Sequence, residues 1–289
     1  MANVLLSVVL SGLMLGGVYA LISSGLNMIY GVMKVINFAQ GEFVMLGMYI
    51  TYWLNFAWKL DPFLTLFVTA PMGFVLGVAV QKLIINRTFG HPIFVQTVAT
   101  FGLLLILQHA ALIVWGASFR TIETPFSSSS FEVLGGVVPL PPFIAFIGAT
   151  IIILSLYLLL TRTVAGMALR ATSENQQIAR LLGIGARKMN YLAFGIAGLT
   201  GFVSGTFLST YFYIYPTVGA IFILRAFIIV VLGGMGNILG ALAGGIVIGE
   251  SEALGGFIFG PQWSEFISLV IFVLVLLLRP AGIFGVRLK

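Results

Sequence analysis

The chain has 289 residues, of which 60% are hydrophobic and only 8% are charged, and its mean hydropathy is +1.14. A soluble domain carries about 25% charged residues, so this composition excludes an ordinary soluble protein and predicts an integral membrane protein. The formal net charge of +6 is expected to mark cytoplasmic loops rather than a surface for nucleic acid. Cysteine is absent from the sequence, which excludes disulfides and thiolate metal sites, and we expect no cofactor.

Apolar stretches alternate with short polar segments along the whole chain. Each stretch is close to the roughly 20 residues that a spanning helix needs, and we expect membrane segments at 4–30, 40–58, 63–84, 92–116, 138–160, 189–212 and 263–279. The stretch 219–256 is interrupted by several glycines, which predicts two shorter helices around a break, as a full or re-entrant hairpin. The sequence therefore predicts a single domain over 1–289, an all-α polytopic bundle of about eight membrane segments.

Basic residues predict how this bundle is oriented. They gather in the link 162–188, in the turn 82–91 and in the C-terminal tail, where Arg279, Arg287 and Lys289 lie. We expect these three regions on the cytoplasmic side of the membrane. The loop 117–137 has one arginine and two acids and is expected outside, which also places the N-terminus outside.

Small residues recur at four-residue spacing in three segments, where they would stack on one face of a helix. These residues are Gly12, Gly16, Ala20 and Ser24, then Ala197, Gly201 and Gly205, and then Gly236, Gly240 and Gly244. Such faces allow two helix backbones to approach closely, so we expect them at helix contacts.

The stretch 33–46, MKVINFAQGEFVML, places several polar residues in an apolar part of the chain. Asn37 is expected to cap a helix that begins just after it, with Gln40 reaching back to the cap and Glu42 stabilised by the helix dipole. A capped helix start inside a bundle could also line a translocation pathway, because its N–H groups attract a carboxylate and Gly41 permits close approach. The two interpretations are compatible, and we expect this helix start to face the pathway.

Arg225 lies within the apolar run AIFILRAFIIVVL, where an unpaired charge would be costly. Either it pairs with an acid such as Glu250 or Glu252, or it faces an aqueous route and meets the carboxylate of a substrate. Asn27 and Asn237 are weaker candidates for the pathway, since each could instead make a hydrogen bond between packed helices.

The longest polar stretch is 161–188, TRTVAGMALRATSENQQIARLLGIGARK. Ser173 and Gln176 have the spacing of a capping box, and Gly183 suits the left-handed residue that ends a helix. The short helix between them would carry its apolar residues on one side, namely Ile178, Leu181 and Leu182. Such a helix could lie in the lipid interface or fill a groove on a soluble partner, and the second interpretation is favoured because two or three apolar anchors give little affinity for lipid.

Four parts of the sequence resemble known transporter segments. ENQQIARLLGIGARKMNYLAF resembles the cytoplasmic coupling loop of ABC importer permeases, and 16–49, GGVYALISSGLNMIYGVMKVINFAQGEFVMLGMY, is similar to the LivH-type permease of branched-chain amino acid importers. RAFIIVVLGGMGNILGALAGG and LLLRPAGIFG are similar to the same family, so the resemblance covers nearly the whole chain. It implies an ATPase-coupling helix made by Glu174, Ile178, Ala179, Leu182 and Gly183, although the Glu-Ala-Ala form of the family motif is not present.

The resemblance implies a permease subunit in the bacterial inner membrane, in contact with lipid. Its partners would be a second homologous permease, two ABC ATPase subunits and an extracytoplasmic substrate-binding protein. Members of the family carry leucine, isoleucine, valine or other amino acids, and close relatives carry urea or short amides. None of the five lysines follows a glycine, so the chain lacks the Gly-Lys-Ser/Thr phosphate loop and any ATPase must be another chain.

Three other classes fit the sequence less well than a permease subunit. A proton-coupled carrier would need buried acids, and the candidates Glu42, Glu250 and Glu252 each lie near an expected helix end. An intramembrane enzyme is disfavoured because the two histidines, His91 and His109, form no His-Glu-x-x-His pair. A stand-alone channel would need no docking helix on its cytoplasmic side. We therefore expect a transporter subunit and not an enzyme.

Overall fold

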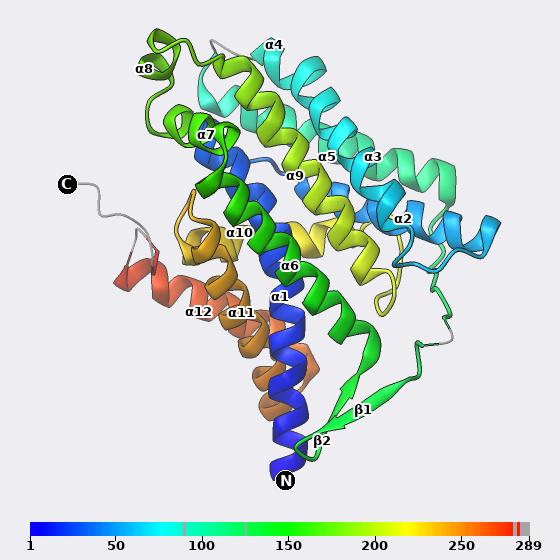
Figure 1. The fold of residues 1–289 in the computed structure, drawn as a ribbon. Helices are drawn as coiled ribbons and strands as arrows, with labels where there is room; N and C mark the ends of the chain where they lie inside the picture. The colour runs from blue at the N-terminus through cyan, green and yellow to red at the C-terminus, as the bar shows by residue number, and fades with distance from the viewer. Residues whose placement is uncertain (89–90, 125, 280–281, 284–289) are drawn as a thin grey trace.

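The computed structural model describes residues 1–88, 91–124, 126–279 and 282–283 (Figure 1). The long helices are α1 (Ala2–Met33), α2 (Gln40–Trp58), α3 (Leu66–Val80), α5 (Ile93–Trp115), α6 (Leu140–Arg162), α9 (Ala186–Leu208), α10 (Val218–Gly233), α11 (Ile238–Phe259) and α12 (Ser264–Leu278). The short elements are the π-helical turn η1 (Gln81–Ile85), α4 (Asn86–Thr88), α7 (Val164–Glu174), α8 (Gln176–Leu181) and the 3-10 turn η2 (Pro261–Trp263). Strands β1 (Ser130–Val133) and β2 (Gly136–Pro139) form an antiparallel hairpin.

The prediction of an all-α polytopic membrane protein is confirmed. Within the described ranges, seven helices are long and apolar enough to cross a membrane, and they include α3 continued through η1 and α4. The shorter α10 and the more polar α2 complete the bundle. The predicted break in 219–256 lies between α10 and α11, at Gly234 and Gly236, whose φ angles of 93° and 90° favour glycine. However, α11 has 22 residues and is therefore not one of two short helices.

Close backbone contacts hold the bundle together. On α1, a Cβ atom added to Gly16 would lie 2.6 Å from the carbonyl oxygen of Gly245 on α11. On α3, a Cβ added to Gly73 would lie 2.5 Å from the carbonyl oxygen of Gly198 on α9. Helix α9 also packs against α2 and is the most buried of the seven spanning-length helices. Two of the expected small-residue faces make such contacts, through Gly16 on α1 and through Gly205 on α9, which meets the backbone of Val44 on α2. In the third, Gly236 lies in the break before α11 and not on the helix that holds Gly240 and Gly244.

The molecule has two distinct ends (Figure 1). The N-terminus and the β1–β2 hairpin lie at one end, where the backbone N–H of Val137 donates to Ser7 Oγ at 2.8 Å. Helices α4, α7 and α8 lie at the opposite end. The hairpin part of the loop 117–137 and the N-terminus thus share an end, as predicted, and the basic regions 82–88 and 162–188 lie at the other end. Two residues of the third basic region, Arg287 and Lys289, lie outside the described residues.

Candidate functional site

The start of α2 is built differently from the predicted capping box. Helix α2 begins at Gln40, and Ala39 is its N-cap residue, without a side-chain cap hydrogen bond in the described structure. Asn37 Oδ1 accepts a hydrogen bond from the N–H of Ala39 at 3.2 Å, which makes a local turn before the helix. Gln40 Nε2 donates to the carbonyl oxygen of Ala197 on α9 at 3.0 Å. The capping-box prediction was wrong because Gln40 is itself the first helical residue and its side chain reaches another helix.

Glu42 lies in the first turn of α2 and is fully buried. Neither of its carboxylate oxygens has a hydrogen-bond partner within the described part of the chain. Its Oε1 lies beside Gly219, the second residue of α10, where an added Cβ would be only 2.7 Å away. Gly41 contacts the carbonyl group of Gly219 so closely that any Cβ would overlap it. The close approach expected at Gly41 is therefore made with the backbone of α10.

The polar residues of 33–46 do not converge on one point. Gln40 and Glu42 are two positions apart, which separates them by about 200° around a helix. Gln40 accordingly faces α9, whereas Glu42 faces α10. Asn37 Nδ2 and Gln40 Oε1 are also buried without a hydrogen-bond partner among the described residues. Unpaired buried polar atoms are uncommon in folded proteins, so their concentration here marks the start of α2 as a candidate site.

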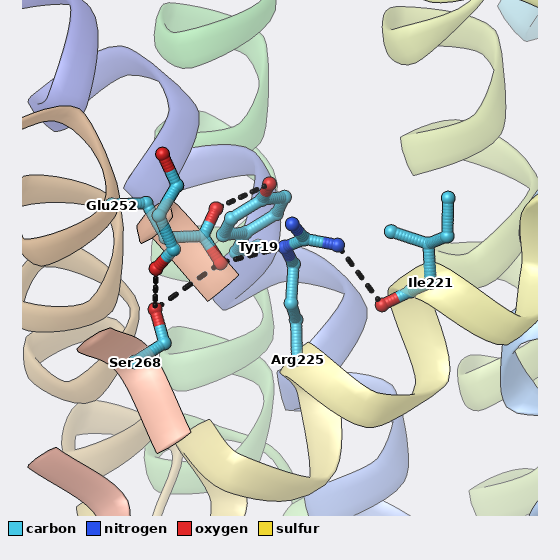
Figure 2. Close-up of polar contacts among 6 residues, drawn as sticks. Tyr19, Ile221, Arg225, Glu252 and Ser268 are labelled. Carbon is cyan, nitrogen blue, oxygen red and sulfur yellow. Dashed lines mark hydrogen bonds and ion pairs between the residues drawn. The ribbon is translucent and has the colours of Figure 1, made fainter. Parts of the chain in front are cut away.

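Arg225 takes part in a network that joins four helices (Figure 2). Arg225 Nε forms an ion pair with Glu252 Oε1 at 2.7 Å, and its Nη1 donates to the carbonyl oxygen of Ile221 at 3.3 Å. Tyr19 Oη donates to Glu252 Oε2 at 3.1 Å, and Ser268 Oγ donates to Glu252 Oε1 at 3.3 Å. The guanidinium also lies 5.5 Å from the centre of the Tyr19 ring. Of the two acids considered for Arg225, the partner is Glu252, and α1, α10, α11 and α12 meet at its carboxylate.

Asn27 and Asn237 stabilise the break between α10 and α11. Asn27 Oδ1 accepts from the N–H of Gly236 at 2.7 Å, and its Nδ2 donates to the carbonyl oxygen of Asn237 at 2.9 Å. Asn237 Oδ1 caps α11 by accepting from the N–H of Gly240 at 3.0 Å. These bonds satisfy backbone groups that the break would otherwise leave unpaired inside the bundle.

The polar link forms two short helices. Asn175, in an extended conformation, separates α7 from α8 and caps α8 by accepting from the N–H groups of Gln177 and Ile178. Ser173 instead donates to the carbonyl oxygen of Arg170 inside α7, so the cap predicted at Ser173 was wrong. The local reason is that Asn175 also has a capping side chain and lies directly before the helix.

Helix α8 exposes its larger apolar side chains. Ile178, Leu181 and Leu182 are all exposed, whereas Ala179 is buried against the rest of the chain. Gly183 has a φ angle of 80°, the left-handed conformation predicted for the end of this helix. Glu174 is the last residue of α7 rather than part of α8. Of the five residues assigned to the coupling helix, Ile178 on α8 and Leu182, the residue directly after α8, therefore offer apolar contact surface. Ala179 packs α8 against the rest of the chain.

Sequence reasoning missed Tyr19, Ser268 and Gly219. Tyr19 is 233 positions from Glu252 in the sequence, and Ser268 lies in an otherwise apolar segment, so no local pattern connects either residue with that acid. Gly219 could have been noticed as a glycine at the start of an apolar run, although its partner on α2 could not.

Comparisons with known proteins agree with this architecture. A family model described as branched-chain amino acid transport system / permease component matches residues 8–276. The high-affinity branched-chain amino acid transport system permease protein BraD of Pseudomonas aeruginosa is 30% identical, over 95% of this chain and 94% of that protein. LivH of Escherichia coli K12, a permease protein of the same description, is 30% identical over the same shares. LivM of Escherichia coli K12, also described so, is 26% identical over 92% of this chain and 67% of LivM. No solved structure matches the chain.

Proposed function

Because this chain belongs to the family of branched-chain amino acid transport system permease components, we propose that it is the membrane-spanning subunit of an ATP-driven importer for branched-chain or related amino acids. The observation that carries the proposal is similarity along 8–276, nearly the full length, to proteins named as permeases of such systems. Seven spanning-length helices among the described residues agree with a multi-pass protein of the bacterial inner membrane.

The proposed assembly contains this chain, a second homologous permease, two ABC ATPase subunits and an extracytoplasmic substrate-binding protein. Support for a second permease comes from Escherichia coli K12, which has two relatives of this chain, LivH and LivM, both named as permease proteins of a high-affinity branched-chain amino acid transport system. The translocation pathway would then form between the two permeases.

The ATPase subunits would dock on α8. Ile178 on α8 and Leu182 directly after it are exposed. Helix α8 lies at the end of the molecule opposite the N-terminus (Figure 1), and a groove on a soluble partner can bind such a helix. Glu174 precedes α8, and Gly183 ends it with a fixed left-handed turn. This assignment makes the α8 end cytoplasmic and the N-terminal end extracytoplasmic, in agreement with the basic residues of 162–188.

The pathway would follow the start of α2 and the neighbouring α10. Unpaired polar atoms lie there on Asn37, Gln40 and Glu42, among the described residues. Gly41 adds a stretch of backbone that no side chain covers. Arg225 and the break at Asn237 would border the pathway. The ion pair of Arg225 with Glu252 and the cap that Asn237 makes on α11 would stabilise this side of it.

The cargo is tested by uptake into proteoliposomes that contain the complete assembly, the binding protein and internal ATP. We expect uptake of radiolabelled leucine, isoleucine or valine, and little uptake of urea or acetamide. Uptake of urea or the amide without uptake of amino acids would contradict the proposed cargo.

A further inference from the structure

Glu42 is a buried carboxylate without a partner in the described part of the chain. The one ion pair among the described residues joins Arg225 to Glu252, so no basic side chain there neutralises Glu42. An ionised carboxylate that is dry and unpaired is strongly unfavourable, and acids within membrane helices usually serve transport. The arrangement of α2 and α10 therefore buries a group whose charged form is costly there, with no described basic side chain to offset the charge.

The contact that covers Glu42 is unusually simple. It joins Gly41 on α2 to Gly219 on α10, backbone against backbone, and neither residue has a side chain that interlocks with the other helix. Helices α2 and α10 both begin at this point, so the positive ends of two helix dipoles favour the charged form of the carboxylate once water reaches it. Separation of the two helices at these glycines would hydrate Glu42, and the Ile223 side chain, which also lies close to Gly41, would move with α10.

The other buried acid is not available for a ligand. Both oxygens of Glu252 are already bound, Oε1 by Arg225 and Ser268 and Oε2 by Tyr19 (Figure 2). Neither oxygen of Glu42 is bound by any residue in the described ranges. A carboxylate in this state is suited to the ammonium group of an amino acid, through charge-assisted hydrogen bonds.

We propose that α2 and α10 separate at the Gly41–Gly219 contact during transport, and that Glu42 then binds the α-ammonium group of the passing amino acid. This inference rests on the proposed function and adds to it a residue that recognises one end of the cargo. The Glu42 carboxylate would also influence the transport cycle. Hydration of the carboxylate favours the state in which α2 and α10 are separated, and the cost of removing that water opposes closure of the two helices when no amino acid is bound.

The direct test is chemical labelling of Glu42 in the complete reconstituted assembly. A water-soluble carbodiimide is applied to the nucleotide-free, the ATP-bound hydrolysis-deficient and the vanadate-trapped states, and the Glu42 peptide is quantified by mass spectrometry. Labelling is normalised to Glu132, which is exposed on β1. We expect labelling to differ by about tenfold between the least and the most reactive state, as a population shift between two conformations would produce. Equal labelling, or none, in all three states would overturn the proposal.

Ligand protection tests the role of the ammonium group. In the most reactive state, excess leucine is expected to reduce labelling of Glu42 at least severalfold, whereas 4-methylpentanoate, which has the same side chain and carboxylate but no ammonium, is expected to leave it unchanged. Equal protection by both compounds would contradict recognition of the ammonium group. If the wild-type assembly imports leucine and Glu42 still shows no state dependence, this inference fails while the proposed function stands.

The variant Glu42→Gln separates a role in transport from a role in folding. It keeps the shape of the side chain but removes its charge, so we expect leucine uptake to be largely lost while the melting temperature of the assembly rises. Glu250→Gln, which changes a partly exposed acid on α11, is the matched control and is expected to retain uptake. Normal uptake by Glu42→Gln, or a fall in its melting temperature, would contradict the proposal.

Discussion

Arg225 on α10 and Glu252 on α11 form an ion pair, with Arg225 Nε 2.7 Å from Glu252 Oε1, in the interior of the bundle. The positive charge of Arg225 and the negative charge of Glu252 offset each other. Tyr19 and Ser268 donate further hydrogen bonds to the carboxylate of Glu252. The structure thus provides a partner for a charge that would otherwise be unstable within an apolar helix.

Arg225→Met should destabilise the protein strongly. It leaves Glu252 buried and unpaired, and loss of one partner of a buried ion pair costs about 3–5 kcal/mol. The double variant Arg225→Met with Glu252→Gln is expected to regain most of the stability and the uptake, because it removes both charges and leaves neither of them buried and unpaired. The measurements are the melting temperature and leucine uptake of the reconstituted assembly. A double variant that is stable but does not transport would show instead that Arg225 contacts the cargo.

Tyr19→Phe should weaken the same network more mildly. It removes the hydrogen bond from Tyr19 Oη to Glu252 Oε2 but keeps the aromatic ring beside Arg225. Loss of a hydrogen bond to a charged group costs about 1.5–3 kcal/mol, so the melting temperature is expected to fall by less than in Arg225→Met. Tyr213→Phe is the control, since Tyr213 is exposed. An unchanged melting temperature in Tyr19→Phe would show that this bond contributes little.

The glycines at the start of α2 and α10 should not tolerate alanine. A methyl group on Gly41 would overlap the carbonyl group of Gly219, and one on Gly219 would lie 2.7 Å from Glu42 Oε1. We expect both alanine variants to lower stability and uptake. In Gly102→Ala the added methyl group would have no described atom within 4 Å, so this control should retain function and gain up to about 1 kcal/mol from helix propensity. Full uptake by Gly41→Ala would argue against a close contact between α2 and α10.

Gly183 tests the link between α8 and ATP hydrolysis. Its φ angle is 80° and no described atom lies within 4 Å of an added Cβ, so a substitution acts through the backbone rather than through a clash. A left-handed conformation costs roughly 1–2 kcal/mol in most residues, whereas asparagine adopts it more readily. We expect Gly183→Val to hydrolyse ATP with reduced uptake and Gly183→Asn to remain coupled. The ratio of leucine imported to ATP hydrolysed decides this, and equal ratios in both variants would contradict a coupling role.

Ala179→Arg is a second test of the same region. Ala179 is buried against the rest of the chain, so an arginine there should displace α8 and uncouple ATP hydrolysis from uptake while the protein still inserts in the membrane. Arg180→Ala, at a neighbouring exposed position, is the control. Coupled transport in Ala179→Arg would mean that the packing of α8 does not matter for transport.

The spans were predictable because apolar runs of helical length are themselves the physical requirement for crossing a bilayer. The predicted ranges 92–116 and 138–160 agree with the bounds of the spanning-length helices α5 and α6, and the glycines of 233–236 correctly marked the break before α11. The cap of α8 was not predictable with the same certainty, because Ser173 and Asn175 both have capping side chains within three positions. Only the folded backbone decides which of them lies directly before the helix.

The polar contacts of the candidate site could not be predicted from the sequence, because the contacting residues lie far apart along the chain. Gln40 resembled a capping residue, but it hydrogen-bonds Ala197, 157 positions later. Arg225 could be expected to need an acid, yet the choice of Glu252 over Glu250 depends on which face of α11 meets α10. Tertiary packing of helices, rather than local propensity, makes that choice.

The proposed function is tested most directly by leucine flux into proteoliposomes that contain this chain. The flux is measured with the second permease and the binding protein present, and with the ATPase subunits either present or omitted. If the chain is a permease subunit, leucine uptake requires both the ATPase subunits and hydrolysable ATP. Leucine flux of equal size in vesicles without the ATPase subunits would contradict the proposed function and would identify the chain as part of a channel or carrier.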